Sequence, residues 1–144
     1  MKFSSTVIIN RPLKEVWEFF DDPDNLKLWL TGFIRFEPLS GTPGSVGARS
    51  KHVYEMNGRT FELIEEVTHR EEYRRLNGEF TSSMMDSRIS NTFHDLNTGS
   101  TKVQSESDVT FKGIMKLFSL FMKNGFRQRQ DADLNKLKMV IETR

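Results

Sequence analysis

The spacing of apolar and polar positions predicts a strand, two short helices, a run of strands and a closing helix. A strand is expected over residues 3–9, which end in β-branched side chains that suit an extended backbone. Pro12 opens a helix with one apolar face, formed by Leu13, Val16, Trp17 and Phe20. Asp22-Pro23 starts a second short helix, which ends at Gly32.

From residue 33 to residue 112 the pattern changes to the two-residue alternation of strands separated by short turns. Asn57-Gly58 and Asn97-Thr98-Gly99 are hairpin signals. Consecutive strands joined by short turns pair in antiparallel fashion, so these residues predict a six-stranded meander with residues 3–9 as a seventh member. The expected strands are 33–36, 46–56, 59–70, 73–80, 84–95 and 100–112.

The C-terminal residues predict two helices. Ile114 to Met122 form a short apolar helix, which Asn124-Gly125 is expected to break. Residues 126–143 predict a long helix with an apolar stripe at Leu134, Leu137 and Ile141. All these faces are buried together if a curved antiparallel sheet grips the last helix, and the gap between them is a natural ligand cavity.

Composition narrows the classes of protein that the chain can belong to. Its 144 residues predict one domain spanning 1–144. The absence of cysteine excludes a disulfide scaffold and a thiol nucleophile, and is typical of a cytoplasmic protein. No apolar signal segment follows Met1, so secretion is not expected. A net charge of +1 argues against a nucleic-acid partner.

Five motifs occur in order along nearly the whole chain: Val7-x-Ile9-x-x-Pro12-x-x-x-Val16-Trp17, Asp22-x-x-x-Leu26-x-x-Trp29, Gly44-x-x-Gly47, Gly99-x-Thr101-x-Val103 and Leu134-x-x-Leu137-Lys138-x-x-x-Glu142. Together they resemble the SRPBCC superfamily, which includes START-like, polyketide cyclase/dehydratase and pollen-allergen proteins. The resemblance implies an α+β helix-grip fold, in which a curved seven-stranded antiparallel sheet wraps around a long C-terminal helix. It also implies a deep hydrophobic cavity for lipids, polyketides, isoprenoids or plant hormones.

Alternation within the strands selects the side chains that face this cavity. In strand 46–56 one alternating set of positions, Arg49, Lys51, Val53 and Glu55, is mostly charged and is expected to face water. His52 and Tyr54 belong to the other set, which is therefore expected to face the interior. Small polar residues at inward positions are unfavourable unless they are hydrogen-bonded or wet, and a ligand-filled cavity would satisfy them. The alternative is a water-filled end of the sheet without a specific ligand. The expected ligand-binding residues are His52, Tyr54, Met85, Asn91, Ser107, Leu134 and Leu137.

No catalytic residue is assigned. The histidines, His52, His69 and His94, lack the paired spacing of a zinc site, so we expect neither a metal nor another cofactor. Glu65-Glu66 would point to opposite faces of a strand, and Asp21-Asp22 is interpreted as a helix cap. An acid or base role for His52 or Tyr54 stays open as an alternative.

The segment 112–129 carries five basic residues and no acidic one, interleaved with large apolar side chains. One interpretation is a lid over the cavity that makes transient contact with an anionic membrane surface. The other, which we favour, is a buried connecting helix with solvated lysines, because the fold needs an apolar plug at this place.

The leading functional prediction is intracellular binding or transport of a hydrophobic small molecule, such as a lipid, an isoprenoid or a polyketide-like compound. An enzyme of the polyketide cyclase, aromatase or dehydratase type is an alternative that no catalytic motif supports. A third possibility is a protein-interaction module similar to the chaperone activators of the superfamily, which would have a filled core and an exposed apolar patch.

Overall fold

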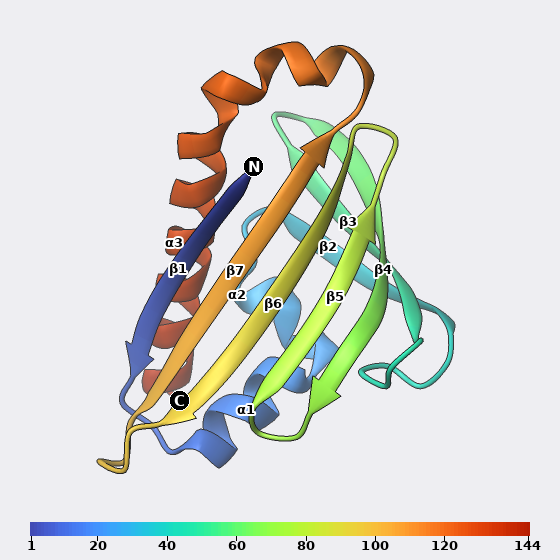
Figure 1. Ribbon diagram of the computed structural model, residues 1–144. Helices are drawn as coiled ribbons and strands as arrows, with labels where there is room; N and C mark the ends of the chain where they lie inside the picture. The colour runs from blue at the N-terminus through green and yellow to red at the C-terminus, as the bar shows by residue number, and fades with distance from the viewer.

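A curved seven-stranded antiparallel sheet wraps around a long C-terminal helix in the computed structural model, which describes residues 1–144 (Figure 1). The spatial order of the strands is β1-β7-β6-β5-β4-β3-β2. The predicted α+β helix-grip fold is therefore confirmed. The strands are β1 (Lys2–Ile9), β2 (Phe33–Ser40), β3 (Arg49–Met56), β4 (Arg59–Glu71), β5 (Arg75–Thr81), β6 (Met85–Asp95) and β7 (Thr101–Phe111). The helices are α1 (Leu13–Asp21), the 3-10 helix η1 (Pro23–Asn25), α2 (Leu26–Trp29), the 3-10 helix η2 (Gly113–Phe118) and α3 (Ser119–Glu142).

The hairpin of β3 and β4 turns at Asn57-Gly58, as predicted. Both residues have positive φ angles, 54° and 77°, which is the backbone that a tight two-residue hairpin turn requires. The turn pairs Met56 with Arg59, and this register places Ser50 directly opposite Glu65. The turn thus decides which side chains of the two strands meet on the concave face.

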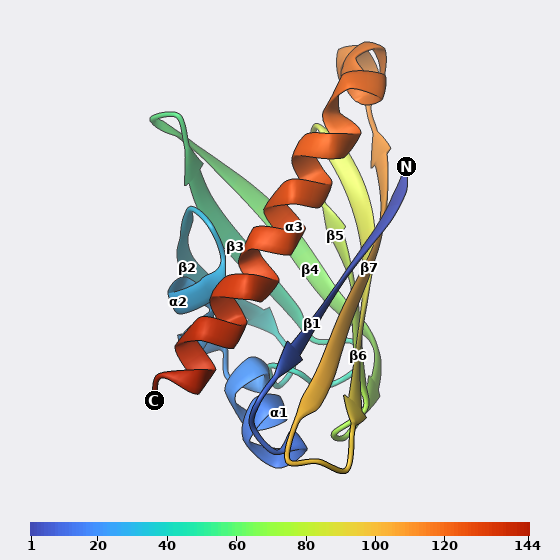
Figure 2. The same ribbon diagram turned by 90° about the vertical axis from the view of Figure 1, so that its left-hand side faces the viewer.

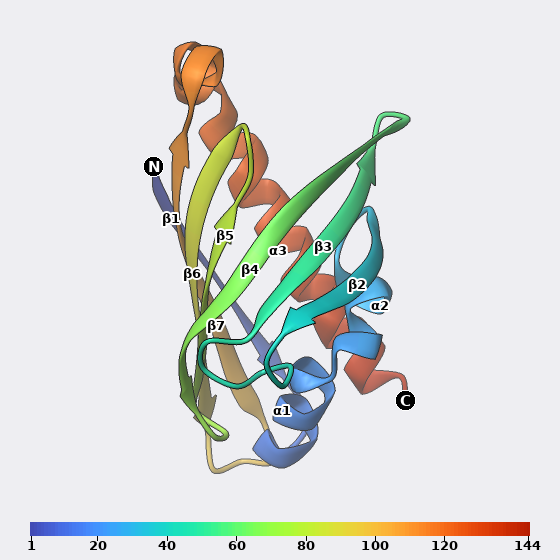
Figure 3. The same ribbon diagram turned by 90° about the vertical axis from the view of Figure 1, so that its right-hand side faces the viewer.

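The hydrophobic core lies at the end of the sheet where α1, α2 and the C-terminal half of α3 meet (Figure 2). The Trp17 ring packs edge-on against Phe93, with ring centroids 5.0 Å apart. The predicted α3 stripe is in this core, with Leu134, Leu137 and Ile141 almost completely buried. Because the core fills only this end, the other end of α3 stands away from β2, β3 and β4 (Figure 3).

The expected helix break at Asn124-Gly125 is wrong, because α3 runs without interruption from Ser119 to Glu142. Neither residue adopts a positive φ angle here. One glycine inside a helix costs about 1 kcal/mol, which tertiary contacts offset easily. The next residue, Phe126, supplies such contacts: its ring centroid lies 5.6 Å from that of Phe111 and 6.4 Å from that of Phe3.

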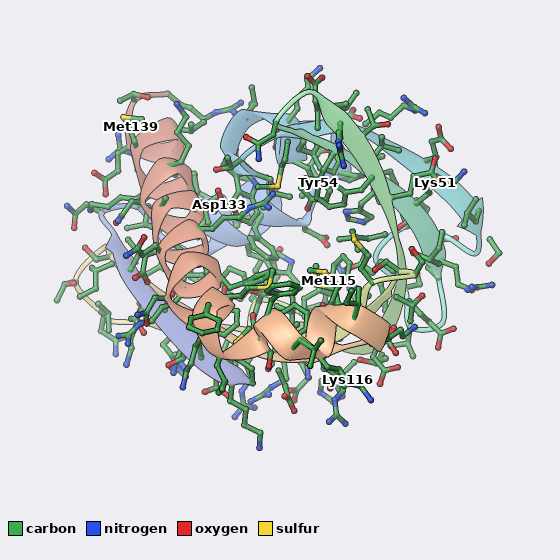
Figure 4. The ribbon with its side chains drawn as sticks, turned by 90° about the horizontal axis from the view of Figure 1, so that it is seen from above. Lys51, Tyr54, Met115, Lys116, Asp133 and Met139 are labelled. Atoms are coloured by element: carbon green, nitrogen blue, oxygen red, sulfur yellow. The ribbon has the colours of Figure 1, made fainter.

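The favoured interpretation of residues 112–129 as a buried apolar plug is also wrong. After β7 the chain continues past the end of the sheet, and η2 with the first turn of α3 forms the top of the molecule in Figure 1. Met115 lies on the inner side of η2 and Lys116 on the outer side (Figure 4). There is no layer above η2 to cover its outer side chains, so five large apolar residues remain exposed: Ile114, Leu117, Phe118, Leu120 and Phe121. None of the helices is both long and apolar enough to cross a bilayer.

Candidate ligand-binding cavity

A cavity of about 270 Å³ lies between α3 and the concave face of the sheet. Six of the seven predicted residues line it: His52, Tyr54, Met85, Asn91, Ser107 and Leu134. Leu137 does not, and that part of the prediction is wrong. It lies nearer the C-terminal end of α3, where the core closes around it and leaves no exposed surface. Apolar walls come from α1, α2, the sheet and α3, including Phe20, Trp29, Phe61, Val67, Val109 and Phe126.

Four small polar residues on β1, β6 and β7 find hydrogen-bond partners within the protein: Ser5, Asn91, Ser105 and Ser107. Ser105 Oγ donates to Asn91 Oδ1 at 2.6 Å, and Ser107 Oγ donates to Gln130 Oε1 at 2.5 Å. The Gln130 amide in turn donates to Ser5 Oγ at 3.1 Å. For these four residues the protein itself therefore supplies the partners that were expected from water or a ligand. Gln130 was missed because nothing in the sequence distinguishes it from the other polar residues of α3.

His52 is a buried polar side chain of the cavity that the protein leaves without a hydrogen bond. It projects inward from β3 with only 4% of its surface exposed, and neither ring nitrogen has a hydrogen-bond partner. Three aromatic rings meet the imidazole at steep angles, with centroids 5.3 to 5.7 Å away: Phe33, Phe36 and Phe80. A buried polar group without a partner costs about 1–3 kcal/mol. The Trp29 indole N–H and Asn77 Oδ1, on other parts of the cavity wall, are also unpaired.

Glu65 brings a carboxylate next to this histidine. Glu65 Oε1 lies 3.3 Å from His52 Nε2, although the two groups are not aligned for a hydrogen bond, and 3.5 Å from Ser50 Oγ. Its neighbour Glu66 points outward, toward Arg49. In the sequence this alternation argued only against a catalytic Glu65-Glu66 pair. The Asn57-Gly58 turn was the signal that could have placed Glu65 opposite Ser50 and diagonal to His52.

A second polar group, which includes Tyr54, lies where β3 faces α3. The Arg129 guanidinium lies 5.3 Å from the Tyr54 ring centroid, and Phe61 stacks on the tyrosine with centroids 5.3 Å apart. Burial raises the pKa of the Tyr54 phenol, so the hydroxyl stays protonated and can donate to a ligand. Burial also raises the pKa of Asp133, while hydrogen bonds from Thr31 oppose the shift. Tyr54 and Asp133 face the same interior space (Figure 4).

At the end of the cavity near α1, an ion pair connects α1 to β4. The Arg70 guanidinium binds both carboxylate oxygens of Asp21, each at 2.7 Å, and lies 5.3 Å from the Trp17 ring centroid. Asp22 accepts a hydrogen bond from the Asp24 N–H at 2.9 Å and so caps η1. The cap interpretation therefore holds for Asp22, whereas Asp21 connects α1 to β4.

No three histidine, aspartate or glutamate side chains come together as metal ligands. His69 forms an exposed pair with Glu71, at 3.1 Å, and His94 lies on the outer face of β6. His52 and Glu65 supply a cavity with one imidazole and one carboxylate. This set can hold a ligand oxygen or exchange a proton with it.

Solved structures of several proteins share this fold. The chain superposes with a TM-score of 0.82 on TTHA0849 from Thermus thermophilus, at 14% identity, covering 99% of this chain and 98% of that one. It superposes with a TM-score of 0.75 on Ara h 8.0201, at 12% identity, covering 100% and 99%. For BexL, described as a di-domain ARO/CYC protein of the BE-7585A biosynthetic pathway, the TM-score is 0.80 at 10% identity, covering 99% of this chain and 46% of BexL. No curated protein sequence matches the chain.

The sequence itself matches one protein family over residues 1–142. That family is described as polyketide cyclase / dehydrase and lipid transport. The match covers every strand and helix that surrounds the cavity. It confirms the resemblance to the SRPBCC superfamily that the motifs indicated. The chain therefore belongs to the polyketide cyclase / dehydrase and lipid transport family.

Proposed function

We propose that this protein binds a hydrophobic small molecule that carries a hydrogen-bonding oxygen, in the cavity between α3 and the sheet. The cavity volume of about 270 Å³ is close to the lower end of the range of small-molecule sites. The apolar walls would supply most of the affinity, at roughly 25 cal/mol per Å² of apolar surface buried. The polar side chains would orient the ligand.

The observation that carries this proposal is the unpaired imidazole of His52. A neutral imidazole offers one donor and one acceptor, which a ligand hydroxyl or carbonyl can use. If this position served only to fill the core, a phenylalanine would suit it better than a histidine, since three phenylalanine rings already surround it. A ligand oxygen beside His52 would remove the cost of burying it.

A matched pair of probes tests this proposal. Anilinonaphthalene sulfonate, a dye that fluoresces in apolar sites, would be displaced by naphthol or by naphthalene, which differ only in a hydroxyl group. We expect naphthol to bind about fivefold more tightly, because one hydrogen bond is worth ~1 kcal/mol. His52→Phe should remove this preference. Equal affinities in the wild-type protein would contradict a polar anchor.

A pair of variants tests the location. Ser87 lines the cavity and makes no side-chain hydrogen bond, so Ser87→Phe should fill the space and weaken dye binding at least about tenfold. Ser107 is less suitable because of its bond to Gln130. Thr110→Phe adds the same ring on the exposed face of β7 and should leave binding unchanged. Loss of binding in both variants, or in neither, would place the dye elsewhere.

A second candidate function rests on the 3.3 Å approach of His52 Nε2 to Glu65 Oε1. Such a pair could act as an acid–base catalyst that removes a proton next to the carbonyl of a polyketide-like compound. The test measures hydrogen–deuterium exchange at the central carbon of benzoylacetone, a β-dicarbonyl compound. Faster exchange with the wild-type protein, lost in Glu65→Gln, would establish catalysis. An unchanged rate would leave binding as the function.

A further inference from the structure

The outer surface of η2 and of the first turn of α3 is unusually apolar. We call the exposed side chains Ile114, Leu117, Phe118, Leu120 and Phe121 the apolar tip; between 51% and 89% of the surface of each is exposed. Single exposed leucines are common on proteins, whereas a contiguous group of this kind marks an interaction surface. The segment that carries the apolar tip, η2 with the first turn of α3, forms the upper end of the ribbon in Figure 1, and none of its residues belongs to the packed core.

Positive charge surrounds the apolar tip. Lys112, Lys116, Lys123 and Arg127 lie in the same segment, and no acidic residue occurs between Asp108 and Asp131. Lys112 pairs with Asp86 at 2.8 Å, whereas the other three form no ion pair and are exposed. Lys116 points away from the interior in Figure 4. The free charges are therefore available to an anionic partner.

We propose that the apolar tip docks onto the surface of an anionic lipid bilayer. Apolar side chains interleaved with basic ones can enter the boundary between headgroups and acyl chains while the basic groups contact lipid phosphates. Charge complementarity selects this partner over a second copy of the chain, because two apposed tips would bring like charges together. None of the side chains of the apolar tip lines the cavity between α3 and the sheet, so the tip faces solvent.

Docking of the apolar tip would bring the membrane close to the cavity. Met85 and Phe126, which line the cavity, lie on strand β6 and helix α3 close to η2. Lys112, at the start of η2, bonds through its backbone N–H to the Met84 carbonyl at 2.8 Å. A bilayer that contacts the apolar tip would thus lie beside one end of the cavity, within reach of molecules dissolved in the membrane.

Vesicle flotation tests the proposal without any cavity ligand. Vesicles of phosphatidylcholine alone would be compared with vesicles of equal parts phosphatidylcholine and phosphatidylglycerol. We expect at least about tenfold tighter binding to the anionic vesicles, and a loss of that preference at high salt. Leu120→Ser/Phe121→Ser should abolish binding, and Lys116→Gln/Lys123→Gln should remove the preference for anionic lipid. Because all four side chains are exposed, the variants should melt at the wild-type temperature.

Val46→Ser is the matched control, since Val46 is 62% exposed in the loop between β2 and β3, at the other end of the sheet. It should bind vesicles as the wild type does. The cavity-filling Ser87→Phe should also bind vesicles normally, which separates this proposal from the proposed function. Absence of binding to both vesicle types, or equal binding by the Leu120→Ser/Phe121→Ser variant, would overturn the proposal. So would a dimer in solution that the same double variant dissociates, because it would assign the apolar tip to self-association.

Discussion

Replacing His52 by phenylalanine should stabilise the protein. The imidazole is 4% exposed, and its two ring nitrogens are without hydrogen bonds among three phenylalanine rings. Each unpaired buried polar group costs about 1–3 kcal/mol. The nearby carboxylate of Glu65, at 3.3 Å, reduces this cost through its attraction to the imidazole. A net gain of ~1–2 kcal/mol follows, because phenylalanine fits the same planar site with no polar atom.

Urea unfolding followed by circular dichroism measures this gain, and a thermal melt should show a rise of roughly 3–6 °C for a chain of this size. His94→Phe is the matched control, since His94 is exposed on the outer face of β6 and its replacement should change the stability little. A loss of stability in His52→Phe greater than ~1 kcal/mol would refute the reasoning. It would mean that the imidazole makes a favourable interaction in the empty protein.

Three further outcomes are expected. Leu137→Ala should lower the free energy of unfolding by ~2–5 kcal/mol, measured by urea denaturation, because Leu137 is fully buried in the core; a smaller loss would contradict that placement. Asp133→Asn should stabilise the protein, and the gain should grow as the pH rises above 3.8, the ordinary pKa of the carboxyl. Burial raises the folded-state pKa of Asp133, so the wild-type protein loses stability as this group ionises. An advantage that does not grow with pH in thermal melts would argue against this desolvation. Addition of a chelator should leave the melting temperature unchanged, and elemental analysis should find no stoichiometric metal; one metal per chain would contradict the absence of ligand clusters.

Two occurrences of the dipeptide Asn-Gly show how far local sequence determines this fold. Asn57-Gly58 forms the predicted hairpin turn with two positive φ angles, whereas Asn124-Gly125 is ordinary helix. Period-two alternation flanks the first pair, so strand pairing reinforces the turn. Helical spacing flanks the second pair, and Phe126 packs onto the sheet, so tertiary contacts favour continuation. Strand order followed from such turns, but the length of the last helix did not.

The cavity was predictable only in part. Alternation along β3 placed His52 and Tyr54 inward, as the structure has them. The partners across the cavity depend on how α3 lies over the sheet, so the bond from Ser107 to Gln130 could not be read from the sequence. Exposure of the apolar tip likewise depends on where η2 leaves the sheet. An apolar segment predicts burial on average, and here the fold provides nothing to cover it.

Native mass spectrometry of the protein purified from its own cells tests most directly whether the cavity holds a hydrophobic ligand. The chain has a mass of 16.8 kDa, and our account predicts a second species heavier by one small molecule. That species should be absent from Ser87→Phe and present in Thr110→Phe. The chain mass alone in the wild-type protein, together with no binding of the apolar dye, would contradict a ligand-binding cavity.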